Sequence, residues 1–302
     1  MKVSSNLTKA WWCVLLAGFL WGVGALVAQS AMHAGISPHS LSLARFALGL
    51  PLLLFWHWRQ HVDKRRHSRW TALPWRMRLH IVLTGVAMAA NVTCWFLGIE
   101  RIGATLPTVI SICFAPVLVA VFSVARGYEH ISARLLCGLV LGVVGVALIV
   151  VAGDFVLPKD YVAGLAWSFG SALLYAMVVL GNARVPKQVS SVTASAWSMS
   201  AATIFMLLVC AIQGVTLPHT QLVWLQVGYT GIVTTSIAYL AFAWGAKHLP
   251  PTAAVVGTLI EPLAAAVLAA WLWNEQLTAQ QYAGAASLAL AMYILSRQQR
   301  AD

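Results

Sequence analysis

The chain has 302 residues, of which 60% are hydrophobic and only 9% are charged, and its formal net charge is +11. Because soluble domains are usually about 25% charged, this composition excludes an ordinary soluble protein and indicates an integral membrane protein. The five cysteines lie in apolar stretches and none has CxxC spacing, so the sequence predicts neither a metal site nor a disulfide framework.

Ten apolar segments follow one another along the chain, each about as long as the 20 residues that a helix needs to cross a bilayer. The first follows Lys2 and Lys9 but is longer than the apolar part of a signal peptide, so we expect it to stay in the protein. We therefore predict an all-α polytopic membrane protein with ten transmembrane helices. Their predicted bounds are 10–33, 37–58, 79–98, 104–125, 132–152, 160–181, 191–212, 222–246, 251–272 and 278–297.

Lysine and arginine are distributed unevenly between the two sides of the predicted bundle. Sixteen lie at the termini or in connections on the N-terminal side, whereas only Arg101 and Lys159 lie on the opposite side. Because cytoplasmic loops are enriched in Lys and Arg, we expect both termini and the loop at 59–78 to be cytoplasmic. The basic run KRRHSR in this loop is interpreted as a topology anchor, with binding of RNA or anionic lipid as the alternative. No nucleic-acid partner is expected.

The sequence repeats itself at an offset of 146 residues. When FAPVLVAVFSVARGYEHIS is aligned with IEPLAAAVLAAWLWNEQLT, Pro116 matches Pro262 and the alignment has no gaps. An odd number of spans in each half requires the second half to enter the membrane from the opposite side. We therefore predict two five-helix halves, 1–153 and 154–302, that form an inverted-topology repeat around a central cavity.

Glu261 lies in the middle of the ninth predicted span, about 15 Å deep at about 1.5 Å per residue. A charge there costs about 2.5–3.5 kcal/mol, and keeping the carboxyl protonated costs a similar amount, so its charge state stays open. Arg45 lies at a similar depth in the second span. Either the two form a buried structural pair or they bind substrate or protons. We favour binding, because intramembrane ionisable residues mark functional sites and Ala115 stands opposite Glu261 in the repeat.

Pro116 and Pro262 occupy matching positions in the two predicted halves, and a proline inside a helix removes a backbone hydrogen bond. We predict a helix break at each of them. Broken helices at matching positions of two halves are the best sequence indication of a transport site, although each proline could instead produce a simple kink.

Polar and aromatic side chains recur at helical spacing in several predicted spans. In lipid such groups also hold helices together, so each one is either structural or part of a binding site. Together with Glu261 and Arg45 they are the candidate substrate-binding or coupling residues. They are Trp21 in the first span, Asn91 and Trp95 in the third, Ser168, Ser171 and Tyr175 in the sixth, and Thr234 and Tyr239 in the eighth.

Sequence patterns that indicate common enzyme classes are missing. The chain has no G-x-x-x-x-G-K-[ST], no HExxH and no GxSxG pattern, so we expect no ATP hydrolysis, no catalytic residues, no metal and no cofactor. A membrane-embedded enzyme would need a paired acid–base constellation, which the sequence does not offer. A purely structural membrane protein would not need Glu261, Arg45 or the matched prolines.

Several motifs resemble one family along nearly the whole chain. The motifs are WGVGALVAQSAM in the first span, ARF in the second, and the two P…E-x-[IL]-[ST]…G signatures. They resemble the drug/metabolite transporter superfamily in its EamA-type ten-helix branch, although YEH at 128–130 departs from the usual glycine-glutamate signature in a loop. The resemblance implies a central cavity lined by spans 1–4 and 6–9, with spans 5 and 10 outside it.

The resemblance also implies export of small metabolites, often amino acids, across the bacterial inner membrane, with the aromatic amino-acid exporter (YddG-like) subgroup as one candidate. We therefore expect a secondary transporter that exports amino acids or similar small metabolites by alternating access. Its expected partners are the small-molecule substrate, membrane lipid and, if transport is coupled, protons. The main alternative is a multidrug/proton antiporter in which Glu261 exchanges protons for a lipophilic cation.

Overall fold

The computed structural model describes residues 2–62, 70–102, 105–150, 160–186, 189–273 and 278–298, and within these ranges it contains helices and no strand. The elements are α1 (Lys2–His33), α2 (Pro38–Val62), η1 (Trp70–Ala72), α3 (Trp75–Ile102), α4 (Thr105–Ala125), α5 (Ala133–Val150), α6 (Tyr161–Ala183), α7 (Ser191–Gln213), α8 (Gln221–Tyr229), η2 (Thr230–Ile237), α9 (Ala238–Ala246), α10 (Pro251–Gly257), α11 (Ile260–Trp273) and α12 (Ala279–Gln298).

The ten predicted spans are confirmed as helical segments with nearly the predicted bounds. The eighth span is one continuous segment made of α8, η2 and α9, and the ninth consists of α10 and α11. By length and composition, six helices in the described part of the chain can cross a membrane: Asn6–His33, Pro38–Arg59, Trp75–Ile102, Tyr161–Ala183, Ser191–Gln213 and Gln221–Ala246. The chain is therefore an all-α membrane protein.

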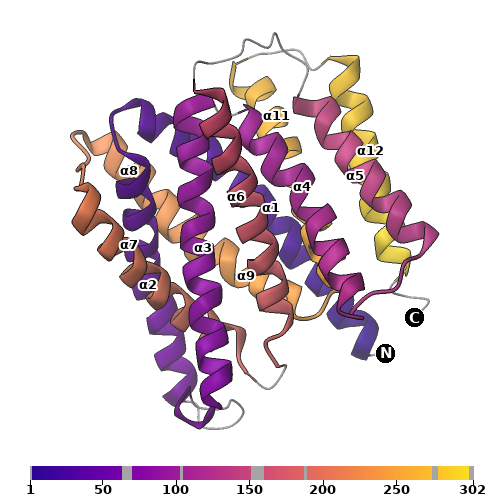
Figure 1. Ribbon diagram of the computed structural model, residues 1–302, viewed down its shortest axis with the longest axis horizontal. Helices are drawn as coiled ribbons and strands as arrows, with labels where there is room; N and C mark the ends of the chain where they lie inside the picture. The colour runs from indigo at the N-terminus through magenta and orange to yellow at the C-terminus, as the bar shows by residue number, and fades with distance from the viewer. Residues whose placement is uncertain are drawn as a thin grey trace.

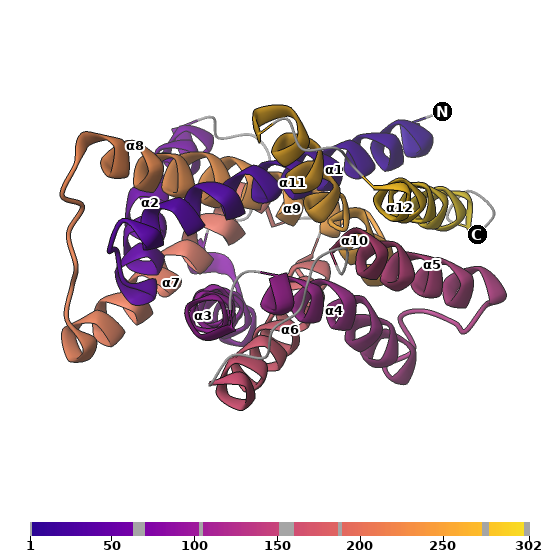
Figure 2. The same ribbon diagram turned by 90° about the horizontal axis from the view of Figure 1, so that it is seen from above.

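The helices form one bundle, and both chain termini lie at the same end of it (Figure 1). We call this end the terminal end. Seen from above, α5 and α12 form a pair at one edge of the bundle (Figure 2). The other helices surround the middle of the molecule, which is where the candidate site lies.

The contacts between helices come in matching pairs that relate the two predicted halves. The third span, α3, packs against the sixth, α6, and the eighth span packs against the first, α1. In the same way α4 packs against α6, and α10 and α11 pack against α1. Further large contacts join α3 to α7 and, as the counterpart, α2 to η2. α2 also packs against α7, and α5 against α12, and each of these pairs consists of counterparts.

α5 and α12 run in opposite directions where they touch. Gly138, early in α5, faces Leu295 near the end of α12, whereas Gly145, later in α5, faces Gly284 earlier in α12. A side chain on Gly145 would begin 2.8 Å from the Gly284 carbonyl oxygen. The close antiparallel contact therefore depends on small residues, as is common between membrane helices.

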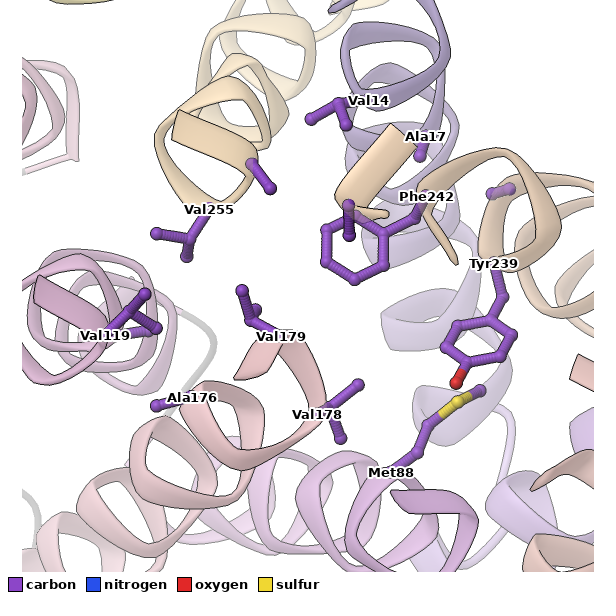
Figure 3. Packing of buried hydrophobic residues seen from close by; sticks show 14 of the residues in the cluster. Val14, Ala17, Met88, Val119, Ala176, Val178, Val179, Tyr239, Phe242 and Val255 are labelled. Atoms are coloured by element: carbon purple, nitrogen blue, oxygen red, sulfur yellow. The ribbon is translucent and has the colours of Figure 1, made fainter. Parts of the chain in front are cut away.

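Buried aliphatic and aromatic side chains from several helices pack together inside the bundle (Figure 3). No single helix provides this packing, because the cluster combines residues from both predicted halves. The labelled residues include Val14 and Ala17 of α1, Val119 of α4, Val178 and Val179 of α6, Phe242 of α9 and Val255 of α10.

One of the two predicted helix breaks is wrong. α4 runs without interruption through Pro116, because a missing backbone N–H is tolerated in a membrane helix that neighbouring helices cover. A break does occur near Pro262, but just before it: α10 ends at Gly257 and α11 begins at Ile260. Pro262 therefore lies in the first turn of α11, where N–H groups have no acceptor within the helix.

Candidate functional site

A cavity of about 120 Å³ lies in the middle of the bundle. Spans 1–4, 6, 8 and 9 provide its walls, and α5 and α12 lie outside it, whereas α7, the seventh span, contributes no lining residue. The cavity is lined by Trp21, Gly24, Ala25, Arg45, Met88, Asn91, Val92, Trp95, Ser111, Ile112, Ser171, Tyr175, Val178, Thr234, Tyr239, Phe242 and Glu261.

Arg45 is 9% exposed and is held by two threonines of η2. Its Nε donates to Thr235 Oγ1 at 2.9 Å, and its Nη2 donates to Thr234 Oγ1 at 3.2 Å. Both hydroxyls donate in turn to the carbonyl of Thr230, which orients them as acceptors toward the arginine. The guanidinium carbon also lies 5.9 Å from the centre of the Phe96 ring, within the range of a cation–π interaction.

The threonine contacts of Arg45 depend on η2, a π-helical stretch inside the eighth span. Such stretches are rare in helices and frequent at functional sites. A side chain on Gly49 of α2 would begin 2.7 Å from the Gly231 carbonyl oxygen, so glycine lets α2 come close to η2. The Ser236 hydroxyl donates to the Gly49 carbonyl at 2.6 Å, and Trp21 Nε1 donates to the Thr234 carbonyl at 2.8 Å. These contacts fix η2 against α1 and α2.

Glu261 occupies the second position of α11, directly after the break in the ninth span. Its backbone N–H donates to the Thr258 carbonyl at 3.0 Å, and the first turn of a helix favours a carboxylate. α1 packs tightly against this turn, because Gly22 has no side chain and faces the Glu261 carbonyl. None of the described residues donates a hydrogen bond to the Glu261 carboxylate.

Arg45 and Glu261 line the same cavity without forming an ion pair. No nitrogen of Arg45 lies within 4.0 Å of a carboxylate oxygen of Glu261. Arg45 is held by the η2 threonines, whereas the backbone of Glu261 is placed by the first turn of α11. The geometry therefore differs from a buried structural pair.

Three polar side chains connect α3, α4 and α6 at one wall of the cavity. Asn91 Nδ2 donates to the Ser171 carbonyl at 2.7 Å and to the Ser171 hydroxyl at 3.0 Å. The Ser111 hydroxyl donates to the Ser171 hydroxyl at 3.2 Å. Ser168, by contrast, is fully buried, donates to the Gly164 carbonyl of its own helix at 2.7 Å and does not line the cavity. Its predicted place in the site is wrong, because its hydroxyl is used within α6.

Aromatic side chains form the wall next to Glu261. The ring of Trp21 lies 6.4 Å from that of Tyr175 in a T-shaped arrangement and 5.3 Å from that of Phe242. The Tyr175 hydroxyl is hydrogen-bonded to Thr258 Oγ1 at 2.9 Å, which ties this wall to the residue just before α11. Figure 3 shows Phe242 close to α1, and Tyr239 beside Met88.

The cavity brings together most of the residues that the sequence singled out. Sequence reasoning missed Thr235 and Thr258, which hold Arg45 and Tyr175, and several lining residues, among them Ser111 and Phe242. Thr235 directly follows Thr234, and Thr258 precedes Glu261 by three residues. Their closeness in sequence to candidate site residues could have indicated both of them. The candidate residues that line this one cavity are Trp21, Arg45, Asn91, Trp95, Ser171, Tyr175, Thr234, Tyr239 and Glu261.

Comparison with known proteins finds similarity over nearly the whole chain. The EamA-like transporter family matches residues 8–151 and 162–297. The chain is 25% identical to the uncharacterized transporter YwfM of Bacillus subtilis, over 94% of this chain and 92% of that protein. It is also 25% identical to the uncharacterized inner membrane transporter YicL of Salmonella typhimurium, over 95% of each. A solved crystal structure has the same fold, with a TM-score of 0.77, 18% identity, and coverage of 97% of this chain and 99% of that one.

Proposed function

Because this chain belongs to the EamA-like transporter family of the drug/metabolite transporter superfamily, we propose that it is a secondary transporter that exports amino acids or similar small metabolites across the inner membrane by alternating access. The family makes the chain a membrane transporter, and one similar protein is named an inner membrane transporter. The substrate class, the direction and the mechanism are the proposal.

The separation of Arg45 and Glu261 is the observation that supports the proposed substrate class. A guanidinium held by two threonines and a carboxylate at the start of α11 face one cavity without contacting each other. Arg45 uses two of its N–H groups on threonines, and the guanidinium has further donors in a geometry suited to a carboxylate. A zwitterionic amino acid offers a carboxylate to Arg45 and an ammonium to Glu261, so it neutralises both charges at once.

The aromatic wall supports a substrate with an apolar or aromatic side chain. Trp21, Tyr175 and Phe242 lie beside Glu261 in the same cavity. Their rings offer apolar surface to a side chain, and the faces of Trp and Tyr attract an ammonium group. This arrangement is compatible with the YddG-like subgroup and favours larger apolar amino acids over small polar ones.

Alternating access requires two related states, which two inverted halves can provide. We place the halves at 1–153 and 154–302. The support is the antiparallel contact of α5 with α12, in which Ser287 donates to the Leu141 carbonyl at 2.7 Å. These two positions are related by the 146-residue offset, and in a two-fold contact a residue near the axis meets its own counterpart. We infer that buried apolar residues such as Val14, Val179 and Val255 close the central cavity on the cytoplasmic side.

A multidrug/proton antiporter is the second candidate, and one observation favours it. No described residue pairs with the Glu261 carboxylate, and aromatic rings lie beside it, which is what a lipophilic cation would need. Arg45 lines the same cavity and repels a cation, so we rank this function below amino-acid export. No catalytic role is proposed for any residue.

Counterflow in proteoliposomes tests the proposal. Vesicles loaded with an unlabelled amino-acid mixture should take up labelled amino acids in a saturable way, several-fold above empty liposomes, and runs with and without a pH gradient show whether protons are coupled. Uptake of tetraphenylphosphonium driven by the pH gradient, with no amino-acid counterflow, would establish the antiporter instead.

A further inference from the structure

The loop that joins α4 to α5 lies at the terminal end of the bundle (Figure 1), and hydrogen bonds hold it at both ends. After Gly127, which has a φ of +69°, the Tyr128 N–H donates to the Ser123 carbonyl at 2.8 Å, a common way for a helix to end. Ser132 Oγ accepts the Leu135 N–H at 3.1 Å and so caps α5. The loop therefore has a defined shape.

Glu129 of this loop binds the start of α10. Its Oε1 accepts the Thr252 N–H at 2.9 Å, and Thr252 belongs to the first turn of α10. N–H groups in a first turn have no acceptor within their own helix, and the helix dipole also favours a carboxylate there. Among the described residues, no lysine, arginine or histidine nitrogen lies within 4.0 Å of the Glu129 carboxylate. The described partner of this charge is therefore α10.

Tyr128 makes a second contact, with the end of α6. Arg184 directly follows α6, and its Nε donates to the Tyr128 hydroxyl at 3.0 Å. The guanidinium carbon lies 5.3 Å from the centre of the Tyr128 ring, within the range of a cation–π interaction. Tyr128 belongs to the YEH stretch, where the chain departs from the usual glycine-glutamate signature. The contact with α6 therefore comes from a residue that the signature does not supply.

Both helices that the loop contacts carry residues of the apolar packing (Figure 3). Val255 lies three residues after Thr252 in α10, Val179 lies five residues before Arg184 in α6, and both are almost completely buried. The loop follows α4 of the first predicted half, whereas α6 and α10 belong to the second. Moving α6 and α10 away from α4 at this end would break both contacts.

We propose that the loop between α4 and α5 is a clasp that keeps the terminal end of the bundle closed, with Glu129 and Tyr128 as its two contacts. When these contacts break, α6 and α10 can move away from α4, and the central cavity opens at this end. The proposal rests on the alternating access of the proposed function. It adds two residues outside the cavity that set how often the transporter opens.

Thiol labelling of the purified full-length protein in detergent measures this opening. In a background without the five natural cysteines, Val255→Cys reports on the apolar packing. Ala28→Cys, at a position of α1 that is 1% exposed, reports on general unfolding. N-ethylmaleimide should label Val255→Cys about fivefold faster when Glu129→Gln is added, because a hydrogen bond to a charged group is roughly twice as strong as a neutral one. Labelling of Ala28→Cys should not change.

Matched variants separate the two contacts from general effects. Tyr128→Phe keeps the ring and removes the hydroxyl, and it should raise the labelling of Val255→Cys about twofold, because contacts of charged groups at the surface contribute little. Tyr282→Phe, at an exposed tyrosine of α12, and Glu100→Gln, at an exposed carboxylate, are the controls and should leave the rate unchanged.

Equal labelling of Val255→Cys with and without Glu129→Gln would overturn the proposal. An equal increase at Ala28→Cys would also overturn it, because Glu129 would then only stabilise the fold. The labelling needs no substrate. A failure of amino-acid counterflow would therefore count against the proposed transport function, whereas a failure of the labelling would count against the clasp.

Discussion

Pro116 in α4 and Pro262 in α11 lie 146 residues apart, yet the backbone around them differs. α4 continues through Pro116, whereas the ninth span stops at Gly257 and restarts at Ile260, ahead of Pro262. The two prolines are alike, so the proline alone does not create the break.

The cause lies in the turn before Pro262 and in the helix packed on it. The Thr258 hydroxyl donates to the Val255 carbonyl at 2.8 Å, which ends α10. α1 approaches the turn through two glycines, since a side chain on Gly18 would begin 2.7 Å from that of Ile260, and Gly22 faces the Glu261 carbonyl. The packing of α1 on this turn therefore maintains the helix break before Pro262. The chain before Pro116 has no such break.

The difference also explains why a carboxylate occurs at this position in only one of the two predicted halves. Glu261 stands at the start of a helix, where the dipole favours a negative charge. Ala115, its counterpart, is fully buried inside an unbroken helix. The scaffold is repeated in the sequence, but the charged site is built in one copy. The predictions below test this comparison, from the largest expected effect to the smallest.

Glu261→Gln should lower the transport rate at low substrate concentration about 10–100-fold, because a hydrogen bond to a charged group contributes about 1.5–3 kcal/mol. Its melting temperature should stay close to that of the wild type, since no described side chain pairs with the carboxylate. The measurement combines counterflow with thermal melting in detergent.

Glu100→Gln is the matched control for this prediction. It removes a carboxylate from the exposed ion pair with Arg101 at 3.3 Å, and transport should be unchanged. If Glu261 were instead the structural partner of Arg45, its loss would cost about 3–5 kcal/mol, and Glu261→Gln with Arg45→Leu would recover both yield and activity. Such a rescue would contradict the account.

Arg45→Lys should reduce transport by about tenfold, a smaller loss than for Glu261→Gln. The charge is kept, but a lysine cannot reproduce the planar donors that meet Thr234 and Thr235, and one weakened hydrogen bond of about 1.4 kcal/mol is a factor of ten. Arg101→Lys on the surface is the control. Equal activity of Arg45→Lys and wild type would show that only the charge matters.

Gly22→Ala should destabilise the protein by about 1–3 kcal/mol, as overpacking usually does, because the added methyl meets the Glu261 carbonyl. Gly228→Ala in α8 is the control, because its added methyl would have no atom within 4 Å, and it should be neutral or slightly stabilising. Melting temperatures of the two variants test the packing of α1 on the break. The same loss in both variants would show that the close approach of α1 is unimportant.

The two prolines should show the smallest effects, and Pro116→Ala should gain up to about 1 kcal/mol of stability from one restored backbone hydrogen bond within α4. Pro262→Ala should change stability by less than about 0.5 kcal/mol, since first-turn N–H groups have no acceptor in the helix. Thermal melting compares the pair. A larger effect at Pro262 than at Pro116 would mean that the proline itself maintains the break.

The helices and much of the cavity were predictable for the same reason. Apolar segments of span length are a strong signal, and polar residues inside them are rare enough to stand out. Asn91, Tyr175 and Glu261 could be singled out because each interrupts an apolar stretch, and helical spacing then placed them on inward faces. Ser168 shows the limit of this reasoning, since a hydroxyl can bond within its own helix.

The remaining features depend on contacts between distant segments. The π-helical stretch at Thr230–Ile237 has no sequence signature, and only the structure shows that Thr235 holds Arg45. Similar depth suggested that Arg45 and Glu261 could pair, but depth does not fix the lateral position of a side chain. Their separation is set by the threonines on one side and the α11 turn on the other.

Counterflow with three matched compounds tests the central claim most directly. Phenylalanine has both charges, phenylalaninamide lacks the carboxylate and 3-phenylpropionate lacks the ammonium, while all three keep the ring. The account predicts that proteoliposomes exchange phenylalanine at least about tenfold faster than either analogue, because each analogue leaves Arg45 or Glu261 without its partner, at about 1.4 kcal/mol or more. Equal rates for all three compounds would contradict the claim that Arg45 and Glu261 together bind a zwitterion.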